Sequence, residues 1–385
     1  MNYEFPIVVS DCPKRNPKNF RSILELFLVC VAACLIVGCK ASEVPLQSGG
    51  VTHVYYIAAE DTDWNYAPDG ANTTYGRPFN CMEALYTDRG PSSIGPIYKK
   101  AVYVEYTDST FTKRKPVAPE WVHKGILGPV IRAEVGDTIQ IYFRNETSFS
   151  ASIHPHGVFY TKSNEGAPTN DGTNGAGASI KPGQSYHYRW TVPERAGPGP
   201  ADPSSIVWIY HSHVNDMADI NAGLMGPIII TRKGMARPDG RPKDVDREFI
   251  TLFMIFDENA SPYLAENEIK YLPGNPACQD DFIEGNKKHA MNGYIFGNMP
   301  MPVMHVGERV RWYLLGMGNE DDIHTPHWHG NTVLEHGFRE DVTDLFPAIF
   351  KEVDMIPDDT GIWLFHCHVT DHMMAGMSGR YQVLP

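Results

Sequence analysis

Two segments of this chain occur twice, in the same order, and this duplication limits the possible folds more than any other feature. The segment VGDTIQIYFRNETSFSASIHPHG at 135–157 aligns with VGERVRWYLLGMGNEDDIHTPHWHG at 306–330. The segment SSIVWIYHSHVNDMADINAGLMGPIII at 204–230 resembles TGIWLFHCHVTDHMMAGMSGRYQVL at 360–384. In each pair a strand-like stretch is followed by a histidine-rich loop. The sequence therefore predicts one domain type that is present twice.

The stretches that lead into these loops have the pattern of β-strands. HVYYIAAE, TIQIYFRN and RVRWYLLGM are rich in β-branched and aromatic residues and are bounded by Gly, Pro, Asn and Asp. This pattern predicts an all-β sandwich or barrel. We expect one domain at 50–232 and a second at 247–385, joined by the turn-rich linker RKGMARPDGRPKDVDRE.

The first 42 residues have a different composition. The basic stretch CPKRNPKNFRS precedes the apolar stretch ILELFLVCVAACLIVGC, which predicts a secretory signal peptide over 1–42 and an extracellular protein. An uncleaved membrane anchor and lipidation at Cys39 remain as alternatives. The mature chain would keep Cys81, Cys278 and Cys367, of which the first two could form a disulfide. The net charge of −13 argues against nucleic acid and anionic membranes as partners.

Histidines gather in four motifs at the duplicated positions. A lone histidine is usually structural, and a single His-x-His pair, which places both rings on one face of a strand, is weak evidence for a metal. Four such motifs at duplicated positions are not explained by chance. They are 154/156, 211/213, 324/327/329 and the stretch HCHVTDHMMAGM from His366 to Met377. The set predicts metal binding.

The single cysteine among these histidines indicates which metal. Two imidazoles, one thiolate and a more distant thioether are the ligands of a blue-copper site, whereas structural zinc would use more thiolates. We assign this type 1 copper to His324, Cys367, His372 and Met377. The eight histidines that remain form four pairs, which suit a three-copper cluster. Because side chains alternate along a strand, His366 and His368 would face away from Cys367.

These motifs resemble those of the multicopper oxidases, and the resemblance covers about 51–385. It implies two cupredoxin-like Greek-key β-sandwich domains with four coppers per functional site, one type 1, one type 2 and two type 3. It also implies reduction of O₂ to water. The ligands carried over from the family are His154 and His327 for type 2 copper, and His156, His211, His213, His329, His366 and His368 for type 3 copper.

The first domain lacks the residues for a type 1 copper of its own. Ser212 stands at the position of Cys367, Met217 at that of His372, and Ala151 at that of His324. The first domain would therefore hold half of the cluster ligands and no blue copper.

Several stretches resemble ceruloplasmin and hephaestin more than laccases, among them LGPVIRAEVGDTIQIYFRN and DREFITLFMIFDEN. The resemblance implies a ferroxidase with Fe(II) as substrate. Its iron site would use Glu284 and His289 of EGNKKHAMNG and Asp371, next to His372. Carboxylates are hard ligands and favour Fe(III). A laccase-like oxidase of phenols or aromatic amines is the alternative.

Ceruloplasmin has six such domains in a closed ring, with the cluster between the first and the last. Two domains cannot close that ring, so we expect a head-to-tail homotrimer with clusters between subunits. A copper nitrite reductase disagrees with this sequence, because it carries its blue copper in domain 1. A non-catalytic relative would lose copper ligands, and here all twelve are present.

Overall fold

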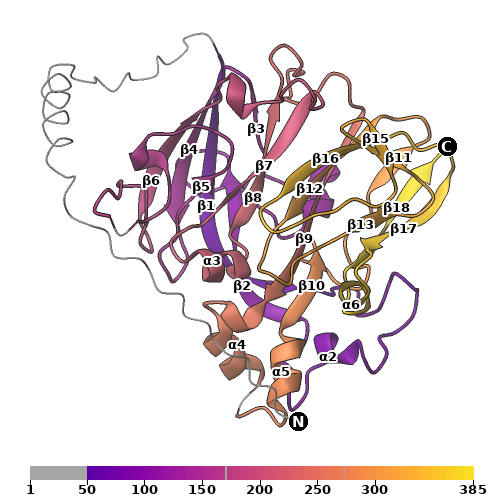
Figure 1. Ribbon diagram of the computed structural model, residues 1–385. Coiled ribbons are helices and arrows are strands. Elements are labelled where there is room, and N and C mark those ends of the chain that lie inside the picture. Colours follow the sequence, from indigo (N-terminus) through magenta and orange to yellow (C-terminus); the bar gives the residue numbers. More distant parts are fainter. Residues whose placement is uncertain (1–49, 170, 273) are drawn as a thin grey trace, which may run out of the picture. The chain divides into compact units, whose positions relative to one another are not determined.

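The structure, a computed structural model, describes residues 50–169, 171–272 and 274–385 (Figure 1). The targeting segment expected at 1–42 lies outside these residues. Strands dominate the described chain, and the all-β prediction is confirmed. None of the helices in the described ranges is both long and apolar enough to span a membrane.

Strands β1 to β8 form the first sandwich. Its outer sheet has the order β2-β1-β4-β6, and its inner sheet has the order β3-β8-β7-β5. The strands are β1 (Thr52–Asn65), β2 (Ile97–Tyr106), β3 (Ile131–Glu134), β4 (Thr138–Asn145), β5 (His154–Pro155), β6 (Ser185–Thr191), β7 (Ser205–His211) and β8 (Met225–Thr231).

Strands β9 to β18 form the second sandwich. Its inner sheet has the order β10-β9-β12-β16-β14-β15, and its outer sheet has the order β11-β18-β17-β13. The strands are β9 (Arg247–Asp257), β10 (Lys287–Met291), β11 (Val303–His305), β12 (Val310–Gly316), β13 (Pro326–Trp328), β14 (Val333–Glu335), β15 (Phe338–Glu340), β16 (Phe350–Met355), β17 (Gly361–Cys367) and β18 (Ser378–Leu384).

The helices are short and lie in the connections between strands. The α-helices are α2 (Ala84–Thr87), α3 (Asp216–Ala222), α4 (Leu264–Tyr271), α5 (Gln279–Gly285) and α6 (Thr370–Met374). The 3₁₀ turns are η2 (Pro119–Lys124), η3 (Lys162–Asn164), η4 (Glu194–Ala196) and η5 (Glu258–Ala260).

The two sandwiches repeat one topology, as the sequence duplication predicts. The parallel pair β1 and β4 corresponds to the parallel pair β9 and β12, and the parallel pair β3 and β8 corresponds to β11 and β18. The short strands β5 and β13 each pair with the strand that ends in the second histidine motif. His154 lies opposite His211, and His327 lies opposite His366. The repeat therefore brings the histidine motifs of each half together by main-chain pairing.

Three apolar cores separate four stacked sheets. One core lies inside the first sandwich and one inside the second. A third core lies between the two inner sheets, and it holds Ile229 of β8 and Leu252 of β9. Both inner sheets are buried on both faces. In β8, Ile228 and Ile230 enter the first core while Ile229 enters the third. In β9, Phe253 enters the core of the second sandwich while Leu252 enters the third. This explains why their strands read as continuous apolar runs and not as alternating ones.

The third core fuses the two sandwiches. The described residues of both sandwiches form one compact unit. The division into separate domains at 50–232 and 247–385 thus remains a prediction, although the sheets divide along the sequence at that place.

A buried ion pair crosses the same junction. The Lys100 ammonium of β2 lies 2.5 Å from the Glu258 carboxylate of η5, and both side chains are fully buried. Tyr66 donates a second hydrogen bond to Glu258, and Lys100 also donates to the carbonyl oxygen of Asn221. The pair is therefore shielded from water and salt, unlike an ion pair at the surface.

Replacing Lys100 by Met is expected to destabilise the copper-free chain by about 3 kcal/mol or more, because Glu258 keeps a buried carboxylate without its cation. Denaturant titration measures the change. The control is Lys99→Met, since Lys99 pairs with Asp61 and Glu266 at the surface and its loss is expected to cost below about 1 kcal/mol. Equal losses in the two variants would contradict a structural role for the buried pair.

Candidate metal centres

Cys367 is the last residue of β17, and its sulfur faces two imidazoles. The Cys367 Sγ atom lies 3.7 Å from Nδ1 of His372 and 4.0 Å from Nδ1 of His324. Helix α6, directly after β17, returns His372 to the strand end, while His324 comes from the segment after β12. Met377 lies in the same core and is fully buried. Its backbone hydrogen-bonds to those of Cys367 and His372, so the four residues assigned to one centre are neighbours in a buried site.

The environment of Cys367 favours its thiolate form. Burial opposes ionisation, but the polar contacts with His324 and His372 and the hydrogen bond from the backbone N–H of Thr325 outweigh it and lower the pKa of the thiol to about 6. A thiolate with two imidazoles is a soft donor set that suits copper. This chemistry fits the type 1 assignment.

Asp322 supports this centre from behind, and the sequence analysis missed it. Its Oδ1 atom accepts a hydrogen bond of 3.1 Å from Nε2 of His324, so Nδ1 of that ring is left to face the sulfur. Asp322 is itself fully buried and accepts backbone N–H bonds from Ile255 and Asn319. A carboxylate behind a ligating imidazole fixes its tautomer and raises its basicity.

His366 and His368 flank Cys367 but join a different group. Nε2 of His366 lies 3.3 Å from Nδ1 of His327 and 3.1 Å from Nε2 of His329. These three residues can offer ligand atoms within 4.8 Å of one another. The His368 ring lies 5.1 Å from that of His327. The alternation of β17 thus separates the two donor sets, as the sequence predicts.

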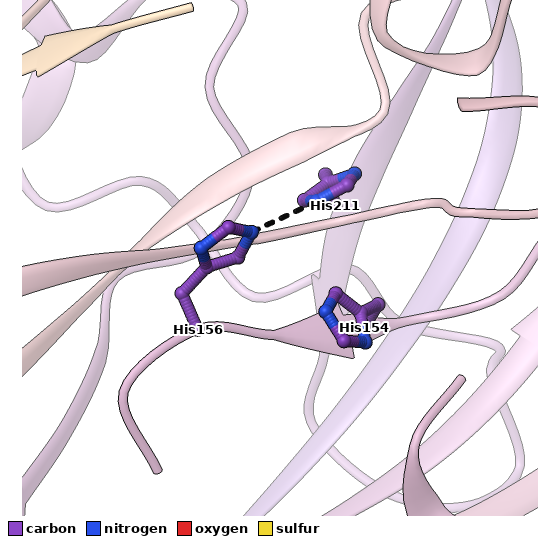
Figure 2. Close-up of side chains that lie close together, drawn as sticks. All are labelled: His154, His156 and His211. Carbon is purple, nitrogen blue, oxygen red and sulfur yellow. Dashed lines mark hydrogen bonds between the residues drawn. The ribbon is translucent and has the colours of Figure 1, made fainter. Parts of the chain in front are cut away.

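The first sandwich holds a matching group, shown in Figure 2. His154, His156 and His211 also offer ligand atoms within 4.8 Å of one another, and Nε2 of His156 lies 3.1 Å from Nε2 of His211. The His213 ring lies 5.1 Å from that of His154. Burial lowers the pKa of His154 to about 4 and that of His156 to about 3. Neutral imidazoles at physiological pH are the form that binds metal.

Hydrogen bonds occupy the place in the first sandwich that corresponds to the Cys367 centre. Ser212 donates to Asp219 of α3 at 2.6 Å and accepts from the backbone N–H of Ser152 at 3.1 Å. Burial raises the pKa of Asp219 to about 6. Met217, at the position of His372, is exposed, and Ala151, at the position of His324, is buried. A polar network stands where the second sandwich has its sulfur and imidazoles.

The two histidine groups lie in different layers of the structure. The first group is carried by β5 and β7 of one inner sheet, and the second by β13 and β17 of the far outer sheet. The inner sheet of the second sandwich and two cores lie between them. Sheets stack about 10 Å apart, so the described chain does not bring its own eight histidines into one cluster.

Two of the three residues assigned to iron, His289 and Asp371, lie beside His372 of the Cys367 centre, and Glu284 is linked to His289 through Tyr86. The His289 ring of β10 lies 5.2 Å from that of His372, and Asp371 directly precedes His372 in α6. Glu284, near the end of α5, accepts a hydrogen bond of 2.9 Å from Tyr86. Within the described residues, these three ligands are not among the groups whose donor atoms all lie within 4.8 Å. Their donor atoms are therefore more widely spaced than those of the copper ligands.

The His289 ring has a nitrogen that could bind a cation. Its Nδ1 atom is buried and has no hydrogen-bond partner within the described residues. Burial first, and the neighbouring His372 second, lower its pKa to about 3, so the ring is neutral. A buried polar atom without a partner is costly in a folded protein, and it often marks the position of an ion or water.

Comparisons with known proteins show which family this chain resembles. Family models described as "Multicopper oxidase" match residues 103–234 and 271–385. The chain is 47% identical to "Ferroxidase HEPHL1" of Homo sapiens over 345 residues, covering 87% of this chain and 29% of that protein. It is 44% identical to "Ceruloplasmin" of Rattus norvegicus, covering 88% of this chain and 33% of that protein. The chain thus spans about a third of the length of these relatives.

Among solved structures, "Multicopper Oxidase mgLAC (data2)" matches with a TM-score of 0.57 and 18% identity, covering 87% of this chain and 88% of that one. At this identity the match shows the fold alone.

Replacing Asp322 by Asn is expected to speed copper loss from the Cys367 centre to a chelator by about tenfold or more, because the imidazole of His324 loses its carboxylate partner. The decay of the blue absorption band measures this rate. Asp321→Asn is the matched control, since Asp321 is the exposed neighbour. Equal rates in both variants would show that Asp322 does not support the centre.

Proposed function

The chain belongs to the multicopper oxidase family, and from this premise we propose that it oxidises Fe(II) to Fe(III) with O₂ as the electron acceptor. The position of His289 and Asp371 next to His372, with Glu284 linked to His289 through Tyr86, carries the proposal. For each O₂ reduced to two waters, four Fe(II) ions and four protons would be consumed. The relative named "Ferroxidase HEPHL1" supports this choice of substrate.

The copper ligands we propose are those carried over from the family. His324, Cys367, His372 and Met377 would hold the type 1 copper. The type 2 copper would take His154 and His327, and the type 3 pair would take His156, His211, His213, His329, His366 and His368. When bound, these coppers would supply one-electron acceptance at the cysteine and reduction of O₂ at the histidines.

The chain's own bonds connect the two kinds of centre. Cys367 faces the core while His366 and His368 reach the opposite side of the same strand. A substrate electron that enters at the cysteine therefore has a short covalent route along the backbone. The Nδ1 atom of His366 also interacts with the carbonyl oxygen of Cys367 at 2.7 Å, which orients the ring.

At the iron site the chain supplies ligands that favour the product. The carboxylates of Glu284 and Asp371 are hard donors, which bind Fe(III) more strongly than Fe(II) and so make the substrate a better reductant. The neutral ring of His289 adds a third donor without adding charge. Because Asp371 precedes His372, the iron would lie next to a ligand of the electron-accepting centre.

We also propose that the complete histidine cluster forms between chains, in a head-to-tail homotrimer. The layered positions of the two histidine groups support this, because each group needs the other from a neighbour. A heterologous contact between the first sandwich of one chain and the second of the next closes into a ring when its rotation allows. The basic and apolar stretches in 1–42 suggest that this assembly acts outside the cell.

The double variant Glu284→Ala/His289→Ala is expected to lose Fe(II) oxidation by roughly 100-fold or more, since even residues behind metal ligands contribute 10- to 100-fold. Oxidation of an aromatic diamine and the blue colour should persist. Steady-state assays under air measure both activities. The control is Asp280→Ala, which removes an exposed carboxylate at the start of the same helix α5. If iron and diamine oxidation survive equally in the double variant, the laccase-like function replaces the ferroxidase.

Mixing two inactive variants tests the shared cluster. His156→Ala damages the group in the first sandwich and His329→Ala damages the group in the second. When the two are refolded together, random pairing should restore roughly a quarter of the wild-type activity, because one contact in four joins two intact halves. Activity and mass by light scattering are measured together. A mixture that stays inactive, with the mass of one chain, contradicts the trimer.

A further inference from the structure

Tyr86 lies among the three residues of the proposed iron site. Its hydroxyl donates to Glu284 at 2.9 Å, and its ring meets the His289 ring edge-on with centroids 6.2 Å apart. Burial is the largest effect that raises the pKa of this phenol, and the charges of Glu284 and Asp371 raise it further. The hydroxyl is thus in direct contact with one carboxylate of the proposed site, that of Glu284. Tyr86 belongs to α2, between β1 and β2, whereas the other three residues follow β9.

A buried lysine holds the backbone of Tyr86 beside that of Glu284. The Lys288 ammonium is fully buried and donates to the carbonyl oxygens of Tyr86 at 2.7 Å, Gly95 at 3.1 Å and Gly285 at 2.5 Å. Gly285 directly follows Glu284. One ammonium thus holds the backbone that carries the phenol next to the backbone that carries the carboxylate, so the fold itself favours their contact.

The absence of a side chain at Gly285 lets α2 and α5 meet at this point. A Cβ atom on Gly285 would lie 2.8 Å from the carbonyl oxygen of Leu85, closer than such atoms approach in proteins. Leu85 and Gly285 are the neighbours of Tyr86 and Glu284. The close backbone approach therefore places the phenol within hydrogen-bond reach of the carboxylate.

Glu284 has one further ionic contact, and it competes with iron. The side chain is 43% exposed, and its Oε2 atom lies 3.7 Å from the Lys287 ammonium. Lys287 and Fe(II) are both cations, so each would draw the same carboxylate. The Tyr86 hydroxyl is neutral and binds the other oxygen, Oε1. The phenol can therefore restrain the Glu284 side chain while leaving the negative charge of the carboxylate available to bind iron.

We propose that Tyr86 is a positioning residue for Fe(II), holding the Glu284 carboxylate in reach of His289 and Asp371 and against capture by Lys287. The inference rests on the proposed ferroxidase function. The proposed iron site then depends on both sandwiches. Tyr86 from the first sandwich orients Glu284, which is a ligand from the second. Iron would then bind to ligands of which one, Glu284, is already held in position by Tyr86.

Steady-state oxidation of Fe(II) and of an aromatic diamine by the copper-loaded full chain tests this. Tyr86→Phe is expected to raise the KM for Fe(II) roughly five- to tenfold, as for a hydrogen bond to a charged, half-exposed group. The kcat for Fe(II), the KM for the diamine and the blue absorption should not change. Adding Lys287→Met to Tyr86→Phe should return the KM towards the wild-type value, since the competing cation is gone. Tyr75→Phe, an exposed tyrosine in the same segment, is the control.

Glu284→Ala, measured in parallel, separates the two hypotheses. If Glu284→Ala weakens Fe(II) oxidation while Tyr86→Phe leaves its KM unchanged, the role of Tyr86 is wrong and the iron site stands. If Glu284→Ala itself has no effect on iron, the proposed function fails and the role of Tyr86 fails with it. If Tyr86→Phe raises both KM values equally, or if Lys287→Met gives no rescue, the residue is structural and the inference is overturned.

Discussion

The alternation of side chains along β17 is the constraint on which the candidate metal centres depend. A strand presents successive residues to opposite faces, so Cys367 enters the core of the second sandwich while His366 and His368 leave it. The core-facing side needs a second imidazole close to the sulfur, and α6 provides it by turning directly after the strand. The other side needs partners from β13, and the pairing of His327 with His366 provides them. The short strand β17 thereby keeps the sulfur-containing donor set apart from the histidine donor set.

The sequence predicts the strands and their duplication, but not how the two copies meet. The alternating stretches and the repeated segments are local signals, and both appear in the structure as two sandwiches of one topology. The third core could not be predicted from them, because an apolar run such as the one around Ile229 indicates burial without naming the partner surface. The ion pair of Lys100 and Glu258 joins residues far apart in the chain. Only the tertiary packing shows that this lysine is buried and Lys99 is not.

The same distinction holds at the candidate sites. Histidine spacing along strands is a local signal, and it predicts which rings gather in each half. Asp322 was missed because it lies in an acidic run next to Asp321, and the sequence does not tell a buried carboxylate from an exposed one. Tyr86 was missed because it meets Glu284 across 198 positions of sequence. The copper ligands can be predicted because their spacing follows the periodicity of the strands. Residues that orient ligands have no such spacing, and only the tertiary structure shows them.

The hydrogen bonds around Ser212 have a consequence for the order of assembly. In the second sandwich a buried thiol and two imidazoles face one another, and the copper we propose there would complete their bonding. In the first sandwich Ser212, Ser152 and Asp219 satisfy one another without any ion. Since these groups are already paired, the interior of the first sandwich needs no copper at this place to reach its final packing.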